Sequence, residues 1–426
     1  MQIGPRRLLI MSAALVALAA CAEPGPSSEY GVLPHRLPEP AYEELFPYYV
    51  EMCALSQFER VGIDASYRAG VSGRPGHAVL YLKGVCREED APIPTLRMCP
   101  EVVNDLADPR HGTGVSVNGL LKNVNWMAFP GRKLFYNGDL ERGQTLTLEH
   151  FRATQQKVID LGLLRGIEVH EEYVKPGRTP EDYLAESLLG TDAAIRFARS
   201  LWCESLPLER EQVELIIAHL NDLNLHYATT DESYEWSFYY DNCVHVLRNS
   251  LAAASVWTPK GVRLNILDQL FQMALPANEF IELANRTALF PLDDFGAVFG
   301  DETMVESLQT YEWLPTRHGA LVKTAPVHRP NELYGTRVNT FVIESLEEEK
   351  SRRVDRLMSD ARFNELEANL LHYEELYGSI LAERDDSGWW PHSDAYHDAR
   401  RRYYEYVESQ LAEVRTMLER LPPAAP

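Results

Sequence analysis

The feature that most constrains this chain is a short apolar segment at its N-terminus. Arg6 and Arg7 precede an apolar run over residues 8–18. The run has the length of the hydrophobic region of a secretory signal and is too short to span a bilayer. No later run approaches the roughly 18 apolar residues that a membrane-spanning helix needs. The sequence therefore predicts a signal peptide over residues 1–20 and a mature chain that folds outside the cytoplasm.

The end of this signal indicates a lipid anchor. It closes on Leu18-Ala19-Ala20-Cys21, which resembles the lipobox of bacterial lipoproteins. In such proteins acyl chains attached at the cysteine bind the membrane through buried CH₂ groups. Because Ala22 rather than Asp follows, the resemblance implies an envelope protein on the periplasmic side of the outer membrane, with the membrane as its first partner. Residues 21–40 contain five prolines and predict a flexible tether. An ordinary secretory signal with an incidental cysteine is the alternative.

Length and composition limit the classes of protein that this chain can belong to. Its 426 residues, 45% of them hydrophobic, predict one large domain with a real core, plus an appendage. A net charge of −22 argues against a nucleic-acid partner. The sequence contains neither paired CxxC zinc motifs nor a glycine-rich nucleotide loop. We therefore expect no cofactor and no metal site.

Six cysteines are present, and their number suggests disulfides. Cys21 is the predicted lipid site, and Cys243 belongs to a motif described below. The remaining four are Cys53, Cys86, Cys99 and Cys203, an even number in an oxidising compartment. Cys86 and Cys99 are close in sequence and could close a short loop. The alternative is that all four are small buried hydrophobic residues, and connectivity cannot be read from the sequence.

Periodicity predicts an α+β fold followed by a helical hairpin. We expect strands at residues 76–82, at 113–129 (one or two), at 134–136 and at 234–240, and helices at 41–60, 191–206, 209–225 and 243–254. Residues 344–381 and 395–421 predict two long helices joined by a turn at 385–388. An apolar seam with coiled-coil-like spacing runs through the second of them. The domain boundaries that follow are 41–340 for the α+β domain, with its core motifs at 60–256, and 341–426 for the hairpin.

Two short motifs carry the residue types of thiol catalysis. Gly76-His77 opens a predicted strand, and Asn242-Cys243 opens a predicted helix. A cysteine in the first turn of a helix lies close to the positive end of the helix dipole and to unpaired backbone N–H groups, which favour a thiolate and can bind an oxyanion. A histidine on a neighbouring strand can accept the thiol proton. Residue types alone fit equally a structural cysteine and a structural histidine.

The order of these motifs resembles the permuted papain-like enzymes of the NlpC/P60 superfamily. More specifically, residues 192–254 resemble the Lnb N-terminal periplasmic domain family, formerly a bacterial domain of unknown function. The matching motifs are Gly76-His77, Asn125-Trp126-Met127-Ala128, Arg199-Ser200-Leu201-Trp202, His219-Leu220-Asn221-Asp222-Leu223 and Phe238-Tyr239-Tyr240-Asp241-Asn242-Cys243. Ala78 and Val244 depart from the family pattern, which has Thr or Ser, and Ala or Thr, at these positions.

The resemblance implies a papain-like antiparallel sheet with packed helices and a role for each motif residue. It implies a thiol nucleophile at Cys243, a catalytic histidine at His77 and acyl transfer through a thioester. The Asn-Trp-Met-Ala match makes Asn125 the candidate that orients the imidazole. We interpret Asn242 as the helix cap and His245, about 200° around the helix from the thiol, as a packing or supporting residue. Asp241, next to the thiol, would oppose thiolate formation.

Three functions remain open from the sequence. The first is a cysteine acyltransferase or amidase acting on a lipid-linked or peptide substrate, similar to a lipoprotein N-acyltransferase. The second is a cell-wall peptidase that uses the same residues. The third is a non-enzymatic envelope scaffold that binds a protein partner through its C-terminal helices, where the aromatic residues Trp389, Trp390, Tyr403 and Tyr404 gather. A thiol sealed from solvent and far from His77 would favour the scaffold.

Overall fold

The computed structural model describes residues 40–55, 59–60, 76–254 except 139, 142, 143, 198, 200, 239 and 240, then 256, 275–287, 317–325, 334–335, 356–384 and 394–421. The predicted signal peptide, the lipid site Cys21, the tether and the 385–388 turn lie outside these residues, as do Trp389 and Trp390. The described residues from Pro40 onward belong to one compact unit.

Strands and helices are interspersed along the chain. The strands are β1 (Tyr49–Leu55), β2 (Glu59–Arg60), β3 (His77–Lys83), β4 (Val85–Arg87), β5 (Leu96–Met98), β6 (Gly112–Val117), β7 (Trp126–Pro130), β8 (Leu201–Pro207), β9 (Leu321–Ala325) and β10 (Tyr334–Gly335). The α-helices are α2 (Pro40–Leu45), α3 (Arg132–Asn137), α4 (Leu148–Asp160), α5 (Pro180–Leu188), α6 (Arg210–Thr229), α7 (Cys243–Ala253), α9 (Pro276–Thr287), α13 (Ala361–Asn364), α14 (Leu366–Ala382) and α15 (Asp394–Arg420). Two 3₁₀ turns, η1 (Glu171–Tyr173) and η2 (Ile195–Phe197), complete the list.

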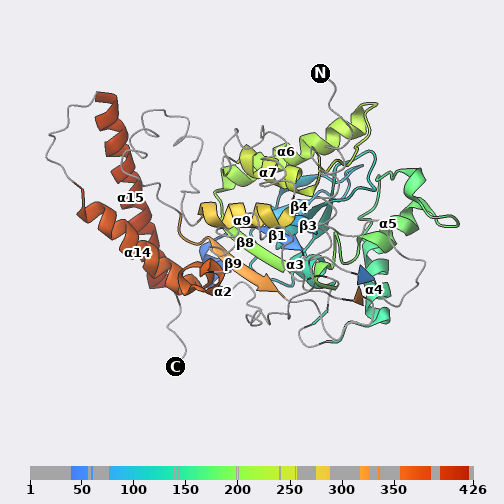
Figure 1. The fold of residues 1–426 in the computed structure, drawn as a ribbon, viewed down its shortest axis with the longest axis horizontal. Helices are drawn as coiled ribbons and strands as arrows, with labels where there is room; N and C mark the ends of the chain where they lie inside the picture. Colours follow the sequence, from blue (N-terminus) through green and yellow to red (C-terminus); the bar gives the residue numbers. More distant parts are fainter. Residues whose placement is uncertain are drawn as a thin grey trace, which may run out of the picture. The chain divides into compact units, whose positions relative to one another are not determined.

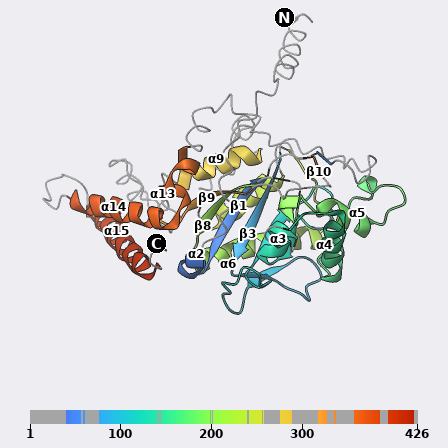
Figure 2. The same cartoon turned by 90° about the horizontal axis from the view of Figure 1, so that it is seen from below.

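The framework is a six-stranded sheet in the order β7-β6-β3-β1-β8-β9, and every neighbouring pair is antiparallel. Its central strands β1 and β3 are buried at every position, because helices cover both faces. Figure 2 shows β1, β3 and β8 side by side within this sheet. The prediction of an α+β fold with an antiparallel sheet is confirmed.

Each face of the sheet has its own helical cover. Helices α7 and α9 pack against the sheet, and α6 packs outside α7 (Figure 1). Helix α3 covers the face that carries Tyr81: the Arg132 guanidinium lies 5.2 Å from the Tyr81 ring centre and binds Glu51 at 2.8 Å. The histidine of β3 shares this face with Tyr81, because alternate strand residues point the same way. The strand that carries His77 is thus held from both sides.

Three local predictions are wrong, each because packing overrides a short apolar pattern. Residues 41–60 were expected to form a helix, but only Pro40–Leu45 does, and β1 follows. Residues 134–136 were expected to form a strand and lie in α3. Residues 191–206 were expected to form a helix and instead contain η2 and β8. Strand β8 is buried on both faces, so it lacks the alternation that identifies a half-exposed strand.

The longer periodic segments are confirmed. Residues 113–129 contain β6 and β7, residues 209–225 lie in α6 except for Glu209, and the helix that starts at Cys243 is α7.

Two further predictions differ from the structure. The aromatic run at 234–240 is not a strand over its described part; Ser237 and Asp241 form an isolated bridge instead. The expected long helix over 344–381 is interrupted within its described part, because Asp360 caps α13 and α14 begins only at Leu366.

The C-terminal helices form the predicted hairpin, which is also attached to the sheet domain. Arg415 of α15 pairs with Glu374 of α14 at 3.0 Å, and Val407 and Val414 of the seam are fully buried. Near β9, the Gly319 N–H donates to Asn369 of α14 at 2.6 Å. No helix among the described residues combines the length and the hydropathy that crossing a membrane would require.

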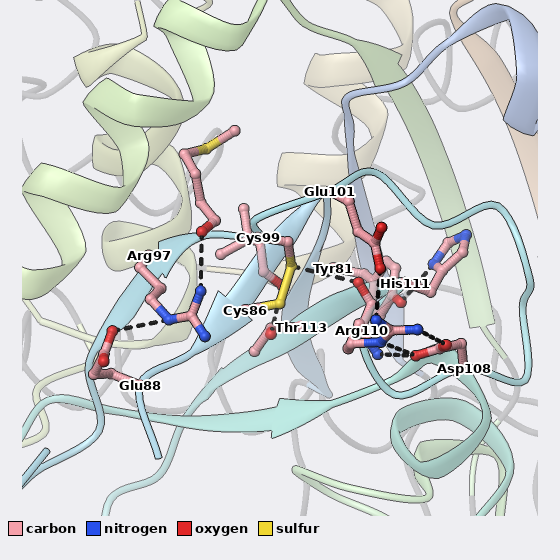
Figure 3. The surroundings of a disulfide bond; sticks show 12 residues. Tyr81, Cys86, Glu88, Arg97, Cys99, Glu101, Asp108, Arg110, His111 and Thr113 are labelled. Carbon is pink, nitrogen blue, oxygen red and sulfur yellow. Dashed lines mark hydrogen bonds and ion pairs between the residues drawn. A yellow bond between two sulfur atoms is a disulfide. The ribbon is translucent and has the colours of Figure 1, made fainter. Parts of the chain in front are cut away.

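Two disulfides link the strands. Cys86 and Cys99, the pair suggested from the sequence, join β4 to the residue after β5 (Figure 3). Cys53 and Cys203 join the paired strands β1 and β8 across 150 residues of chain. Cys243 is the free cysteine of the described residues, which leaves its thiol available for chemistry.

Candidate active site

His77 is the first residue of β3, and the glycine before it fixes that start. Gly76 has a φ of +102°, and a Cβ there would lie 2.6 Å from the Leu55 carbonyl oxygen. Only glycine adopts this conformation beside β1 without strain. The Gly-His pair therefore reflects a backbone requirement that places the imidazole at the end of the central strand.

Cys243 is the first residue of α7, and Asn242 caps that helix. The Asn242 side-chain oxygen accepts from the backbone N–H groups of Val244 at 2.8 Å and His245 at 3.3 Å. The Cys243 N–H has no acceptor among the described residues. The cap thus binds two of the backbone N–H groups at the helix start. The N–H group of Cys243 itself stays available to bind an oxyanion.

A hydroxyl and a carboxylate hold the imidazole of His77 from behind. His77 Nε2 lies 2.8 Å from Ser116 Oγ and 3.6 Å from Asp192 Oδ1. Ser116 Oγ donates its single proton to Asp192 at 2.6 Å, so it must accept from His77, whose Nε2 carries a proton. The nitrogen that remains for the thiol is Nδ1. Asn118 binds the other Asp192 oxygen at 2.7 Å and fixes the carboxylate.

The electrostatics of His77 show that it interacts with the thiol of Cys243. The pKa of His77 is raised to about 9. Burial lowers this pKa, but the charges of Cys243 and Asp192 and their hydrogen bonds raise it by more. The imidazolium form is therefore favoured at neutral pH when the sulfur is ionised. This arrangement can perform nucleophilic acyl chemistry with a thiolate–imidazolium pair.

Both side chains of the pair are largely buried. Cys243 is 8% exposed and His77 is 7% exposed. A thiol that is both sealed and distant from His77 would favour the scaffold hypothesis. The thiol is largely covered, yet a hydrogen bond and the charge of Cys243 both raise the pKa of His77, so the two side chains are neighbours and not distant.

Two further motif residues, Asn125 and His245, bind the residues that precede Cys243. Asn125, the expected orienter, donates from Nδ2 to Asp241 at 3.5 Å, while the groups at His77 Nε2 are Ser116 and Asp192. Burial raises the pKa of Asp241, while hydrogen bonds from Tyr227 and Asn125 lower it. His245 Nδ1 lies 3.0 Å from Asn242 Oδ1, which fits its interpretation as a supporting residue.

Sequence reasoning did not identify Ser116 and Asp192. Ser116 pairs with Val79 of β3, two residues beyond His77, and so points to the same face. Asp192 lies 76 residues further along the chain, beside Leu188 at the end of α5. Nothing in local composition distinguishes it from other acidic residues.

One further cluster has the atom types of a metal site. Glu51, Cys53 and Cys203 place a carboxylate and two sulfurs together, but the sulfurs form a disulfide and cannot act as thiolate ligands.

Comparisons with protein-family models, curated proteins and solved structures find no match to this chain.

Proposed function

We propose that this protein is a cysteine acyltransferase or amidase with a permuted papain-like fold, in which Cys243 is the nucleophile and His77 the acid–base. One observation carries the proposal: the free thiol at a capped helix start neighbours an imidazole whose Nε2 donates to Ser116, which in turn donates to Asp192. The motif order supports the papain-like assignment, since histidine precedes cysteine along the chain.

The proposed reaction has two half-steps. The Cys243 thiolate attacks the substrate carbonyl, and the Cys243 N–H, at the helix start, stabilises the oxyanion that forms. The tetrahedral intermediate collapses as the carbonyl-to-leaving-group bond breaks, and imidazolium His77 gives its proton to the leaving group. The resulting thioester is then attacked by an amine or by water, whose proton returns to His77, and the thiolate leaves.

The proposed setting is the bacterial envelope. The signal segment and the lipobox-like ending at Cys21 support a lipid-anchored protein on the periplasmic side. The two disulfides fit an oxidising compartment. A lipid-linked or peptide acyl group is therefore the proposed substrate.

The thioester itself provides the test. The purified protein is mixed with an activated acyl ester, such as a p-nitrophenyl ester, and quenched in acid for intact-mass and peptide analysis. We expect one acyl group on Cys243, none on Cys243→Ser, and accumulation at least about 10²-fold slower in His77→Gln, because its acid–base group is gone. Acylation of other residues only, or equal rates in His77→Gln, would contradict the proposal.

A further inference from the structure

Two arginine side chains meet at Gly162, and within the described chain neither pairs with a carboxylate. Arg87 ends β4 and donates from Nη2 to the Gly162 carbonyl at 3.2 Å. The guanidinium of Arg165 lies over the same residue, because a methyl group on Gly162 would sit 3.1 Å from Arg165 Nη2. Two positive groups thus converge from β4 and from the loop after α4.

The buried member of this pair keeps two donors without acceptors. Arg87 is 9% exposed, and its Nε and Nη1 atoms are covered and find no hydrogen-bond partner in the described structure. Burial and the charge of Arg165 lower the pKa of Arg87 to about 10, so it stays charged at neutral pH. Buried charged donors that lack partners destabilise the folded state, because they have lost their hydrogen bonds to water. An anion would offset this cost.

The missing carboxylate is not explained by composition. The chain holds 63 acidic residues against 41 basic ones, and acidic side chains lie near both arginines in sequence. Glu88, next to Arg87, pairs with Arg97 at 3.0 Å. Asp160, two residues before Gly162, accepts from Gln156 at 2.8 Å. Glu88 and Asp160 are therefore engaged elsewhere, while the charge of Arg165 acts on Arg87.

We propose that Arg87 and Arg165 form a binding site for a phosphate-type oxyanion, which uses none of the residues of the thiol site. Guanidinium groups bind phosphate oxygens through parallel N–H donors. Arg165 is exposed, so its side chain can turn aside and admit the anion to the covered edge of Arg87. Free phosphate and the phosphate of a lipid headgroup offer the same chemistry.

Calorimetric titration of the purified protein at low ionic strength tests this site. The probes are inorganic phosphate and a short-chain phosphatidic acid, with chloride of matched ionic strength as the control. We expect Arg87→Gln and Arg165→Gln to weaken binding at least tenfold and Arg97→Gln to leave it unchanged, since Arg97 already pairs with Glu88. Binding of phosphate alone identifies a free anion as the ligand, and binding of the lipid alone or of both identifies the headgroup phosphate as accepted; each supports the site.

A purely structural role for Arg87, capping the end of α4, predicts a different pattern. In that case Arg87→Gln lowers the melting temperature, while wild-type protein binds neither probe and gains no stability from phosphate. That result, or an equal loss of binding in Arg97→Gln, overturns the proposal. If Arg87→Gln does not fold, exposed Arg165 still decides the question. The outcome is independent of Cys243 activity.

Discussion

Two buried histidines of this protein lie beside carboxylates and yet have opposite charge preferences. His77 is 3.6 Å from Asp192, and its pKa is raised to about 9. His111 is 2.9 Å from Glu43, and its pKa is lowered, because burial and the charges of Arg132 and Lys83 outweigh the carboxylate. A neighbouring carboxylate therefore does not by itself identify a catalytic histidine.

The difference lies in the remaining charges of each cluster. Around His111, Glu43 is shared with Lys83 at 2.7 Å, and Tyr81 binds the second imidazole nitrogen at 2.8 Å. The charges there are compensated, and His111 serves as a neutral bridge. Around His77 the groups that raise its pKa are Cys243 and Asp192. An uncompensated negative surrounding is what prepares an imidazole to exchange a proton with a thiol.

Replacing each histidine separates these roles most sharply. We expect His77→Gln to slow acylation of Cys243 by roughly 10²–10⁴-fold. His111→Gln should leave acylation unchanged and lower the free energy of unfolding by roughly 1–3 kcal/mol, because buried partners lose hydrogen bonds. Acylation rates and urea unfolding of both variants measure this. An equal loss of acylation in His111→Gln would remove the distinction between the two clusters.

A smaller effect is expected from the carboxylate behind the imidazole. Asp192→Asn removes one negative charge from His77, so the pKa of His77 falls from about 9 toward its ordinary value. The alkaline limb of the pH–rate profile should move to lower pH, because the imidazolium is lost earlier. The rate loss should stay below the roughly 10⁴-fold seen for a directly bonded triad aspartate, since Ser116 still accepts from Nε2. A simple stability effect would leave the position of the limb unchanged.

The sequence predicts the parts of this site that depend on local rules. Gly76 requires a backbone conformation that only glycine tolerates, and Asn242 is a strong helix cap, so both motifs stand out locally. Asp192 does not, because its role arises from the register of β3 with β6 and from a loop far along the chain. Long-range pairing of this kind leaves no periodic trace.

The same limit explains the errors in the fold. Helix α6 and the hairpin helices have one buried and one exposed face, which gives a clear period. Strand β8 is buried on both faces, so its apolar residues do not alternate with polar ones as in a half-exposed strand. The fold class and strand β3 were predictable, whereas the positions of β1 and β8 were not.

The most direct test of the thiol–imidazole pair is the pH dependence of Cys243 alkylation by iodoacetamide, read by peptide mass spectrometry. The account predicts fast alkylation near pH 7 and a second step near pH 9, where His77 loses its proton. In His77→Gln this second step should disappear. A single titration near the roughly 8.5 of an ordinary thiol, identical in wild-type protein and His77→Gln, would contradict the pair.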